Sequence, residues 1–323
     1  MHARRAALVV ATGLAACDVS VTVGYNDALV PGASCPADAP LRACSTETCV
    51  VTELTSAQMG KETLAVDAEH IYFITETDVL SSMPKGGGAV VELATVAPSL
   101  ERLTVDEENV YWTEFDGRIF RVPKAGGTTE SVTEIFGHPI SIASHDADLY
   151  LALTDSGEVA KVTKSSGATT TLAGENAPID LGVDGEHVYW INQGQPGEAN
   201  GELVRAPLGD LTGAEVILSS LDEPLVLGVA SDAIVWATFD KVFRLSREGG
   251  DPSVFEAPFG EPKGVTELDG TLYVAGQMGV YRIRIGDGDA LALDGRGMTG
   301  LALGCDGLYA VGWFEPILLR YGP

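Results

Sequence analysis

Basic residues are scarce in this chain. It carries 20 Lys and Arg residues against 46 Asp and Glu residues, a formal net charge of −26 at pH 7 over 323 residues. Nucleic-acid binding and polybasic membrane contacts both depend on Lys and Arg. The composition therefore argues against both, and the strong charge of one sign favours a soluble monomer.

Long glycine-free stretches are also missing. The longest of them, residues 89–116, contains Pro98, and the chain has 38 glycines in all. Because glycine and proline weaken helices, a bundle of long helices is excluded. Hydrophobic residues make up 45% of the chain, so disorder is excluded as well. A mainly β protein remains.

The N-terminal region has the features of an exported protein. Arg4 and Arg5 precede an apolar run over residues 6–14, which is shorter than the roughly 20 residues a spanning helix needs. Leu14-Ala15-Ala16-Cys17 resembles the lipobox of bacterial lipoproteins, and this resemblance implies that Cys17 is lipidated and becomes the mature N-terminus. The alternative is an ordinary secretory signal with an incidental cysteine. We expect a signal peptide over residues 1–16 and a lipid-anchored protein of the bacterial cell envelope, periplasmic or surface-facing.

Residues 17–48 are rich in Ala, Pro, Asp and Ser, and we expect them to form a flexible tether. Export would place the remaining four cysteines in an oxidising compartment, where an even number suggests two disulfides. These disulfide candidates are Cys35, Cys44, Cys49 and Cys305. All three possible pairings join Cys305 to the N-terminal region, and the alternative is a free Cys305 beside one local bridge.

An internal repeat dominates the rest of the chain. A dipeptide that usually begins with Tyr follows a short apolar strand and a polar turn, with spacings of 39, 39, 39, 46, 38 and 36 residues. Its seven copies are Tyr72-Phe73, Tyr111-Trp112, Tyr150-Leu151, Tyr189-Trp190, Val235-Trp236, Tyr273-Val274 and Tyr309-Ala310. A third strand with a basic residue at a fixed place follows, as in Ile119-Phe120-Arg121-Val122, and then a fourth strand. Four strands in roughly 40 residues are the unit of a β-propeller blade.

The strand count predicts how the ring closes. Seven third strands are present, but only six fourth strands follow them, because the sequence stops after the seventh third strand. Val50 to Leu54 has the spacing of a fourth strand relative to the first repeat. We therefore predict an all-β, seven-bladed β-propeller over residues 49–323, closed by an N-terminal strand that also covers an open sheet edge.

One repeat resembles a known family. Tyr111-Trp112-Thr113-Glu114 is similar to the signature of YWTD propellers, and the repeat as a whole resembles NHL-like propellers of exported bacterial lipoproteins. The resemblance implies a propeller over residues 50–323. It also implies two possible enzyme classes, because propellers with similar repeats include lyases and lactonases.

Residues that repeat in every blade are expected to be scaffold, since seven equivalent copies cannot all meet one substrate. We expect the basic positions to form a solvated or salt-bridged stripe and the Tyr-Trp positions to pack between blades. After cleavage only His70, His138, His145 and His187 remain, without metal-ligand spacing. We predict no metal site, no cofactor and no catalytic residue.

Function is expected where the copies differ. Blade four carries about six extra residues between its second and third strands, and the equivalent loops of other blades hold acidic, amide and aromatic side chains. Such loops share one face with the channel mouth, and their groups suit a polar ligand or a protein partner. The candidate ligand-binding residues are Glu114, Phe115, Asp116, Asp155, Asn192, Gln193, Gln195, Asp240, Gln277, Trp313 and Phe314. Ordinary solvated loops are the alternative.

Two functions remain open from sequence. The first is a non-enzymatic, lipid-anchored module that binds an envelope protein, peptide or glycan. The second is a lyase or lactonase-like enzyme with its site at the channel mouth. The enzyme would need a general base or a metal there, and this chain offers carboxylates but no histidine cluster.

Overall fold

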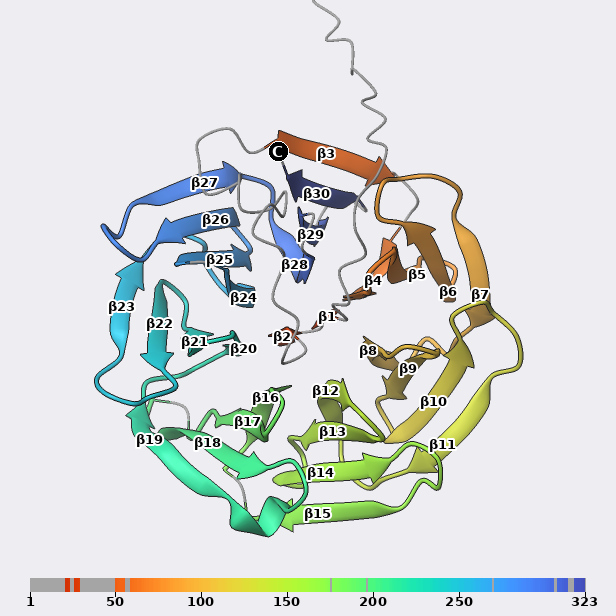
Figure 1. The fold of residues 1–323 in the computed structure, drawn as a ribbon, viewed down its shortest axis with the longest axis horizontal. Helices are drawn as coiled ribbons and strands as arrows, with labels where there is room; N and C mark the ends of the chain where they lie inside the picture. Colours follow the sequence, from red (N-terminus) through yellow and green to blue (C-terminus); the bar gives the residue numbers. More distant parts are fainter. Residues whose placement is uncertain are drawn as a thin grey trace, which may run out of the picture.

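The repeats fold into seven four-stranded antiparallel blades around a central axis, as the computed structural model shows (Figure 1). The structure describes residues 21–23, 26–29, 50–55, 59–174, 176–195, 197–268, 270–304, 307–312 and 317–322. The prediction of an all-β, seven-bladed propeller is confirmed. Within those ranges the one helical element is a short 3-10 helix, Leu211–Gly213.

Each blade runs from an innermost first strand to an outermost fourth strand. Blades 1 to 3 are β4 (Met59–Val66), β5 (His70–Thr75), β6 (Val79–Pro84), β7 (Val91–Thr95); β8 (Leu100–Val105), β9 (Asn109–Glu114), β10 (Arg118–Pro123), β11 (Glu130–Glu134); and β12 (Pro139–His145), β13 (Asp148–Leu153), β14 (Glu158–Thr163), β15 (Thr169–Ala173). Blades 4 and 5 are β16 (Pro178–Val183), β17 (His187–Asn192), β18 (Gly201–Pro207), β19 (Glu215–Leu221); and β20 (Val226–Val229), β21 (Ala233–Ala237), β22 (Lys241–Ser246), β23 (Ser253–Glu256). Blades 6 and 7 are β24 (Pro262–Leu268), β25 (Thr271–Gly276), β26 (Gly279–Arg284), β27 (Ala290–Asp294); and β28 (Met298–Gly304), β29 (Gly307–Gly312), β30 (Leu318–Gly322), β3 (Val50–Thr55).

The propeller closes as the strand count predicts. β3 pairs antiparallel with β30, with Val50 opposite Gly322 and Thr55 opposite Leu318. The outermost strand of blade 7 therefore comes from a segment before blade 1, and Figure 1 shows it beside the C-terminal strand.

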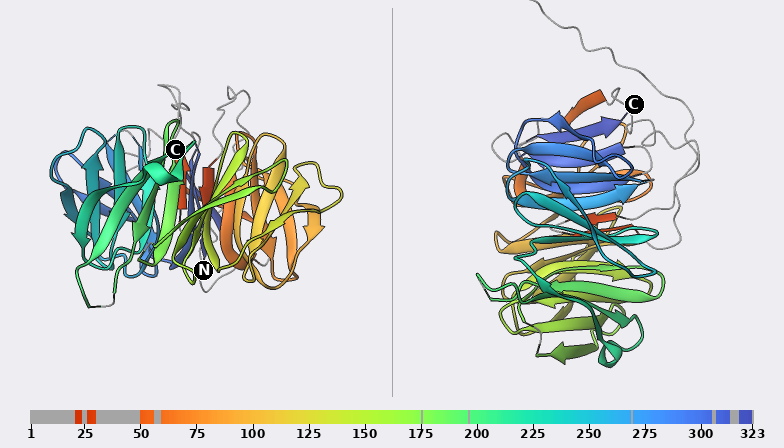
Figure 2. Two further views of the ribbon diagram at one scale, coloured as in Figure 1. Left: turned by 90° about the horizontal axis from the view of Figure 1, so that it is seen from below. Right: turned by 90° about the vertical axis from the view of Figure 1, so that its left-hand side faces the viewer.

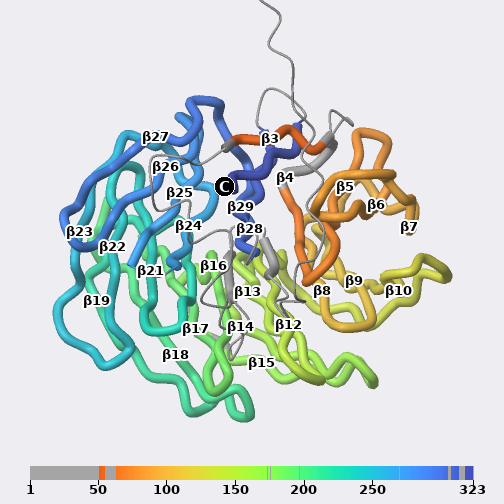
Figure 3. Tube along the Cα trace, turned by 45° about the horizontal axis from the view of Figure 1, so that its top comes forward, coloured from red at the N-terminus to blue at the C-terminus, as the bar shows by residue number. Residues whose placement is uncertain are grey.

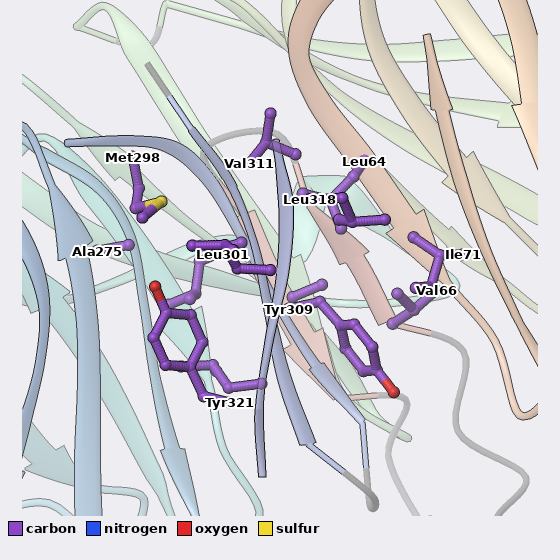
Figure 4. Packing of buried hydrophobic residues seen from close by; sticks show 14 of the residues in the cluster. Leu64, Val66, Ile71, Ala275, Met298, Leu301, Tyr309, Val311, Leu318 and Tyr321 are labelled. Carbon is purple, nitrogen blue, oxygen red and sulfur yellow. The ribbon is translucent and has the colours of Figure 1, made fainter. Parts of the chain in front are cut away.

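The repeated Tyr-Trp positions pack between blades, which confirms their structural role. Trp112, Trp190 and Trp236 are each at most 2% exposed. Tyr72 of blade 1 shares a hydrophobic cluster with Trp112 of blade 2, and Tyr150 of blade 3 shares one with Trp190 of blade 4. Figure 4 shows the cluster that joins blades 6, 7 and 1.

The strand order gives the propeller two distinct faces, seen edge-on in Figure 2. The turns between first and second strands, and between third and fourth strands, lie on one face, which we call the 1–2 face. The turns between second and third strands, and the connections between blades, lie on the opposite face, which we call the 2–3 face. The predicted ligand-binding loops of blades 2 to 6 belong to the 2–3 face.

Buried aspartates in the turns of the 1–2 face tie neighbouring blades together. The Asp67 carboxylate accepts hydrogen bonds from the Glu69 and His70 amides and from the Tyr72 hydroxyl, at 2.7 to 2.8 Å. It also pairs with Lys124 of the next blade at 2.5 Å. Two other blade junctions have the same ion pair, Asp106 with Lys164 at 2.9 Å and Asp184 with Arg247 at 2.8 Å.

The repeated basic position on the third strands forms ion pairs, as expected. These pairs are Arg121 with Glu130, Lys161 with Asp148, Arg205 with Glu215, Arg244 with Glu267, and Arg282 with Asp289, at 2.6 to 4.0 Å. Arg282 is only 1% exposed, so at this position the stripe is salt-bridged and not solvated.

Two short strands lie inside the ring of first strands, β1 (Val21–Val23) and β2 (Asn26–Leu29), as Figure 1 shows. They belong to the segment 17–48 that the sequence predicts to be a tether. The rest of that segment lies outside the described residues.

Candidate functional site

The candidate residues that the structure describes lie on the 2–3 face in several different blades. The structure brings Glu114 and Asp116 together around Arg118, at 2.5 and 2.9 Å. Asp155, Asp240 and Gln277 are exposed side chains of blades 3, 5 and 6. Trp313 and Phe314 lie outside the described residues, as do Cys17 and the four disulfide candidates.

The blade 2 turn holds two carboxylates around one guanidinium. Burial raises the pKa of Glu114, and the Arg118 guanidinium opposes that rise. The Arg118 hydrogen bond lowers the pKa of the exposed Asp116 carboxyl. Because the two carboxylates share a single guanidinium, one negative charge of this turn stays uncompensated within it, and the exposed Asp116 carboxylate can meet a ligand.

Exposed apolar side chains gather on the 2–3 face. Phe115, Phe136, Phe239 and Met278 are 54 to 86% exposed, and all four lie in its turns and connections. The other exposed large hydrophobic residues lie on fourth strands or directly before them, on the outer rim: Val90, Val91, Val216 and Val254. Sequence analysis selected Phe115 but missed the other three residues of the face. Phe136 and Met278 each directly precede a glycine, and such an apolar residue beside a turn glycine is the signal that could have identified them.

Phe115, Phe136 and His138 lie at the junction of blades 2 and 3. The rings of Phe115 and His138 lie 4.3 Å apart between centroids at a 45° tilt. The Phe115 amide donates to the Ser99 carbonyl at 2.8 Å, so its backbone is held in place. Phe136 lies two residues before His138 in the sequence, and its side chain is the most exposed of the three. We call these three residues the blade 2/3 patch.

Phe239 and Met278 form a second apolar site at blades 5 and 6. The Met278 amide donates to the Phe259 carbonyl at 2.9 Å, and the Ala257 amide donates to the Asp240 carbonyl at 3.3 Å. The two loops that carry Phe239 and Met278 therefore border the connection between β23 and β24.

The blade 4 insertion is ordered by its own side chains. The Asn200 side chain accepts from the Gln195 amide at 2.8 Å and donates to Glu198 at 3.1 Å. The Gly197 amide donates to Glu223 at 3.0 Å. Asn192, at the end of β17, is buried, whereas Gln195 is exposed. The insertion therefore presents Gln195, but not Asn192, to a partner.

A cavity of about 500 Å³ lies on the opposite, 1–2 face, between blades 2 and 3, and sequence analysis did not predict it. Its wall includes Asp106, Tyr111, Arg121, His145 and Lys164. Burial raises the pKa of Tyr111 to about 12, and the neighbouring Asp106 adds to that rise. Arg121 and Lys164 are both engaged in ion pairs within the protein. This wall is therefore the seam between two blades, built from scaffold positions.

The described ranges contain neither a metal-binding cluster nor a membrane-spanning helix. No cluster of His, Cys, Asp and Glu side chains there could hold a metal ion. No helix there is long and apolar enough to cross a membrane.

The sequence matches no protein-family model and no curated protein. Several solved structures share the fold. The structure of YCF48 bound to the D1 peptide has a TM-score of 0.62 at 13% identity and covers 86% of this chain and 98% of its own. The WD40 propeller of Doa1 has a TM-score of 0.62 at 14% identity, covering 79% and 90%. The nidogen/laminin complex has a TM-score of 0.55 at 16% identity, covering 69% and 91%. These likenesses establish a β-propeller fold.

Proposed function

We propose that this protein is a lipid-anchored module of the bacterial cell envelope that binds a protein or peptide partner through its 2–3 face, without catalysis. The carrying observation is the gathering of Phe115, Phe136, Phe239 and Met278 on that face. Exposed aromatic and Met side chains are enriched in the cores of protein interfaces. Apolar patches on an otherwise strongly acidic protein need such an explanation.

Two of the structurally similar propellers support a protein or peptide as the partner. One was solved bound to a peptide, and the other in a complex of nidogen with laminin. The blade 4 insertion and the exposed polar groups Gln277 and Asp240 would form the polar rim around the apolar anchors.

The competing hypothesis of a lyase or lactonase-like enzyme is less well supported. Such an enzyme would use the channel mouth, where a general base or a metal must meet the substrate. In this chain β1 and β2 lie within the channel and pair with its wall. They compete with a substrate for that space.

Site-specific photocrosslinking tests the binding face. A photoreactive amino acid in place of Phe136 should give one discrete adduct with an envelope protein, identified by mass spectrometry. The matched control is Val254, which is 51% exposed on the outer rim. The same adduct from both positions, or adducts with glycan alone, would reject the proposed partner.

The anchor is tested separately by Cys17→Ser. We expect the wild-type chain to fractionate with membranes and the variant to be released after export. A wild-type chain that is soluble and unlipidated would show that the anchor is wrong and leave the binding face to be judged on its own.

A further inference from the structure

The β1–β2 hairpin crosses the centre of the propeller and joins two distant blades. β1 pairs antiparallel with β4 of blade 1, and β2 pairs parallel with β20 of blade 5. β1 and β2 also pair with each other. Blades 1 and 5 thereby become one continuous ten-stranded sheet. Figure 1 shows β1 and β2 between β4 and β20 at the centre of the ring, and Figure 3 shows the blades around that centre in a tilted view.

The pairing register tells which way the hairpin points. Val21 lies opposite Val66, the last residue of β4, and Val23 lies opposite Leu64. On the other side, Asn26 pairs with Leu227 and Ala28 with Val229, the last residue of β20. β4 and β20 both run toward the 1–2 face. Val21 and Leu29 therefore lie at the 1–2 face, and β1 runs from there toward the 2–3 face.

The distance from the hairpin to Cys17 is short. Val21 lies four positions after Cys17, and an extended chain over four positions spans at most about 14 Å. A first strand of seven residues, such as β12, is about 23 Å long. Starting from the 1–2 end of the channel, Cys17 cannot reach beyond the 2–3 face.

The other end of the hairpin agrees with this route. Val50 pairs with Gly322, the last residue of β30. Because β30 is a third strand, its last residue is at the 1–2 face. Leu29 and Val50 therefore both lie at that face. A connection between them does not require the chain to pass through the channel.

We propose that the β1–β2 hairpin fixes the membrane anchor to the 1–2 face, so that this face lies against the bilayer and the 2–3 face projects away from it. The proposal rests on the lipid at Cys17 in the proposed function. In this orientation the 1–2 face, which carries the ion pairs between blades, is the face that meets the membrane. It also places the blade 2/3 patch where a protein partner can reach it and the bilayer cannot.

The alternative is that Phe136 and the other exposed apolar residues insert into the membrane beside the anchor. Aromatic side chains do favour membrane interfaces. That arrangement needs the anchor on the 2–3 face, and the register of β1 opposes it. The two arrangements orient the propeller oppositely, so they can be told apart.

Fluorescence quenching from the bilayer decides the orientation. The lipidated full-length chain is reconstituted in vesicles of phosphatidylethanolamine and phosphatidylglycerol that contain a head-group nitroxide lipid. A bio-orthogonal fluorophore is placed at Glu186, exposed on the 1–2 face, or at Asp155, exposed on the 2–3 face. We expect severalfold stronger quenching at Glu186. Equal quenching, or stronger quenching at Asp155, would overturn the proposal.

Two variants separate the hairpin from the anchor. Thr22→Pro with Asp27→Pro removes two backbone donors from the hairpin, and Ala33→Pro with Ala37→Pro places the same two changes outside it. Deletion of residues 19–29 removes the hairpin and keeps Cys17. We expect the double-proline hairpin variant and the deletion to be quenched equally at the two labelled positions. The Ala33→Pro, Ala37→Pro control should keep the stronger quenching at Glu186. A difference that persists in the deletion would overturn the role of the hairpin.

Hydrogen exchange keeps this test distinct from that of the anchor. If the hairpin is seated, amides of β4 and β20 should exchange faster in the deletion variant than in the full chain, with or without lipid. Unchanged exchange would reject the hairpin itself. A chain that carries no lipid but shows this protection would reject the anchor, and the membrane orientation with it. Circular dichroism of each variant confirms that the blades remain folded.

Discussion

The two faces of the propeller are built from different kinds of position in the repeat. On the 1–2 face, Asp67, Asp106 and Asp184 occupy equivalent turns, and each pairs with a cation of the next blade. On the 2–3 face the turns hold side chains that differ from blade to blade, and four of them are exposed and apolar. Repeated positions therefore stabilise the ring, whereas unrepeated positions provide a surface for recognition.

The largest effect is expected from the 2–3 face, at the backbone of its turns. Gly117 has φ +93°, and a Cβ there would lie 1.8 Å from the Ile135 carbonyl oxygen. Gly117→Ala should lower the free energy of unfolding by about 4 kcal/mol, because a strained φ and a clash with backbone add. Chemical denaturation measures it. Gly174→Ala is the control, since φ is +94° there but nothing lies within 4 Å. Equal losses of unfolding free energy in the two variants would show that the close approach of the Ile135 carbonyl is unimportant.

A slightly smaller loss is expected from the ion pairs of the 1–2 face. The Asp184 carboxylate is 4% exposed and holds Arg247 at 2.8 Å and the Tyr189 hydroxyl at 2.9 Å. Asp184→Ala should cost about 3 kcal/mol, because a half-buried guanidinium and a buried hydroxyl lose their acceptor. Asp251→Ala, an exposed residue of the next blade's turn, should cost little. Equal melting temperatures for the two variants would contradict the stabilising role of the 1–2 face.

Acid should weaken the 1–2 face selectively. Burial raises the pKa of Asp67 and Asp106, but the lysine partners and backbone amides outweigh burial and hold both below the ordinary value. The unfolded chain, with carboxyl pKa values near 4, then binds more protons than the folded one. This contribution is complete above that value and is lost as the pH falls through the lowered folded pKa.

Melting temperatures between pH 6 and pH 2.5 measure this dependence. Asp67→Asn keeps an acceptor for the turn amides but cannot titrate, so its melting temperature should fall less steeply in acid. Asp155→Asn, exposed on the 2–3 face, is the matched control and should keep the full slope. If the melting temperatures of the two variants fall equally steeply with pH, the ion pairs between blades are not the cause of the acid sensitivity.

The sequence predicted the scaffold well because each blade repeats the same local physics. Spacing and polar turns identified all seven blades, and the count of fourth strands identified β3 as the closing strand. The basic position was understood as a salt-bridged stripe, but burial of Arg282 was not, since it depends on packing around blade 6.

Features that belong to no repeat were the ones that sequence analysis missed. β1 and β2 are too short to stand out, and their pairing partners lie some 40 and 200 residues further along the chain. The contact of Phe115 with His138 joins two blades through loops, which no periodic pattern encodes. The candidate loops were on the right face to meet these residues, but the choice of Asn192 ignored that the end of a second strand is buried.

The smallest effect on stability is expected where the effect on recognition is greatest. Phe136 is 86% exposed, so Phe136→Ser removes almost no buried area, and surface substitutions of this kind change the free energy of unfolding by less than about 0.5 kcal/mol. A Phe at the centre of an interface can carry much of the binding energy. We therefore expect an unchanged melting temperature together with loss of the partner identified by crosslinking, measured by affinity capture with the purified partner. Val254→Ser on the outer rim should retain both properties. If Phe136→Ser still binds the partner, Phe136 does not carry the recognition that we assign to the 2–3 face, and the contrast with the 1–2 face fails.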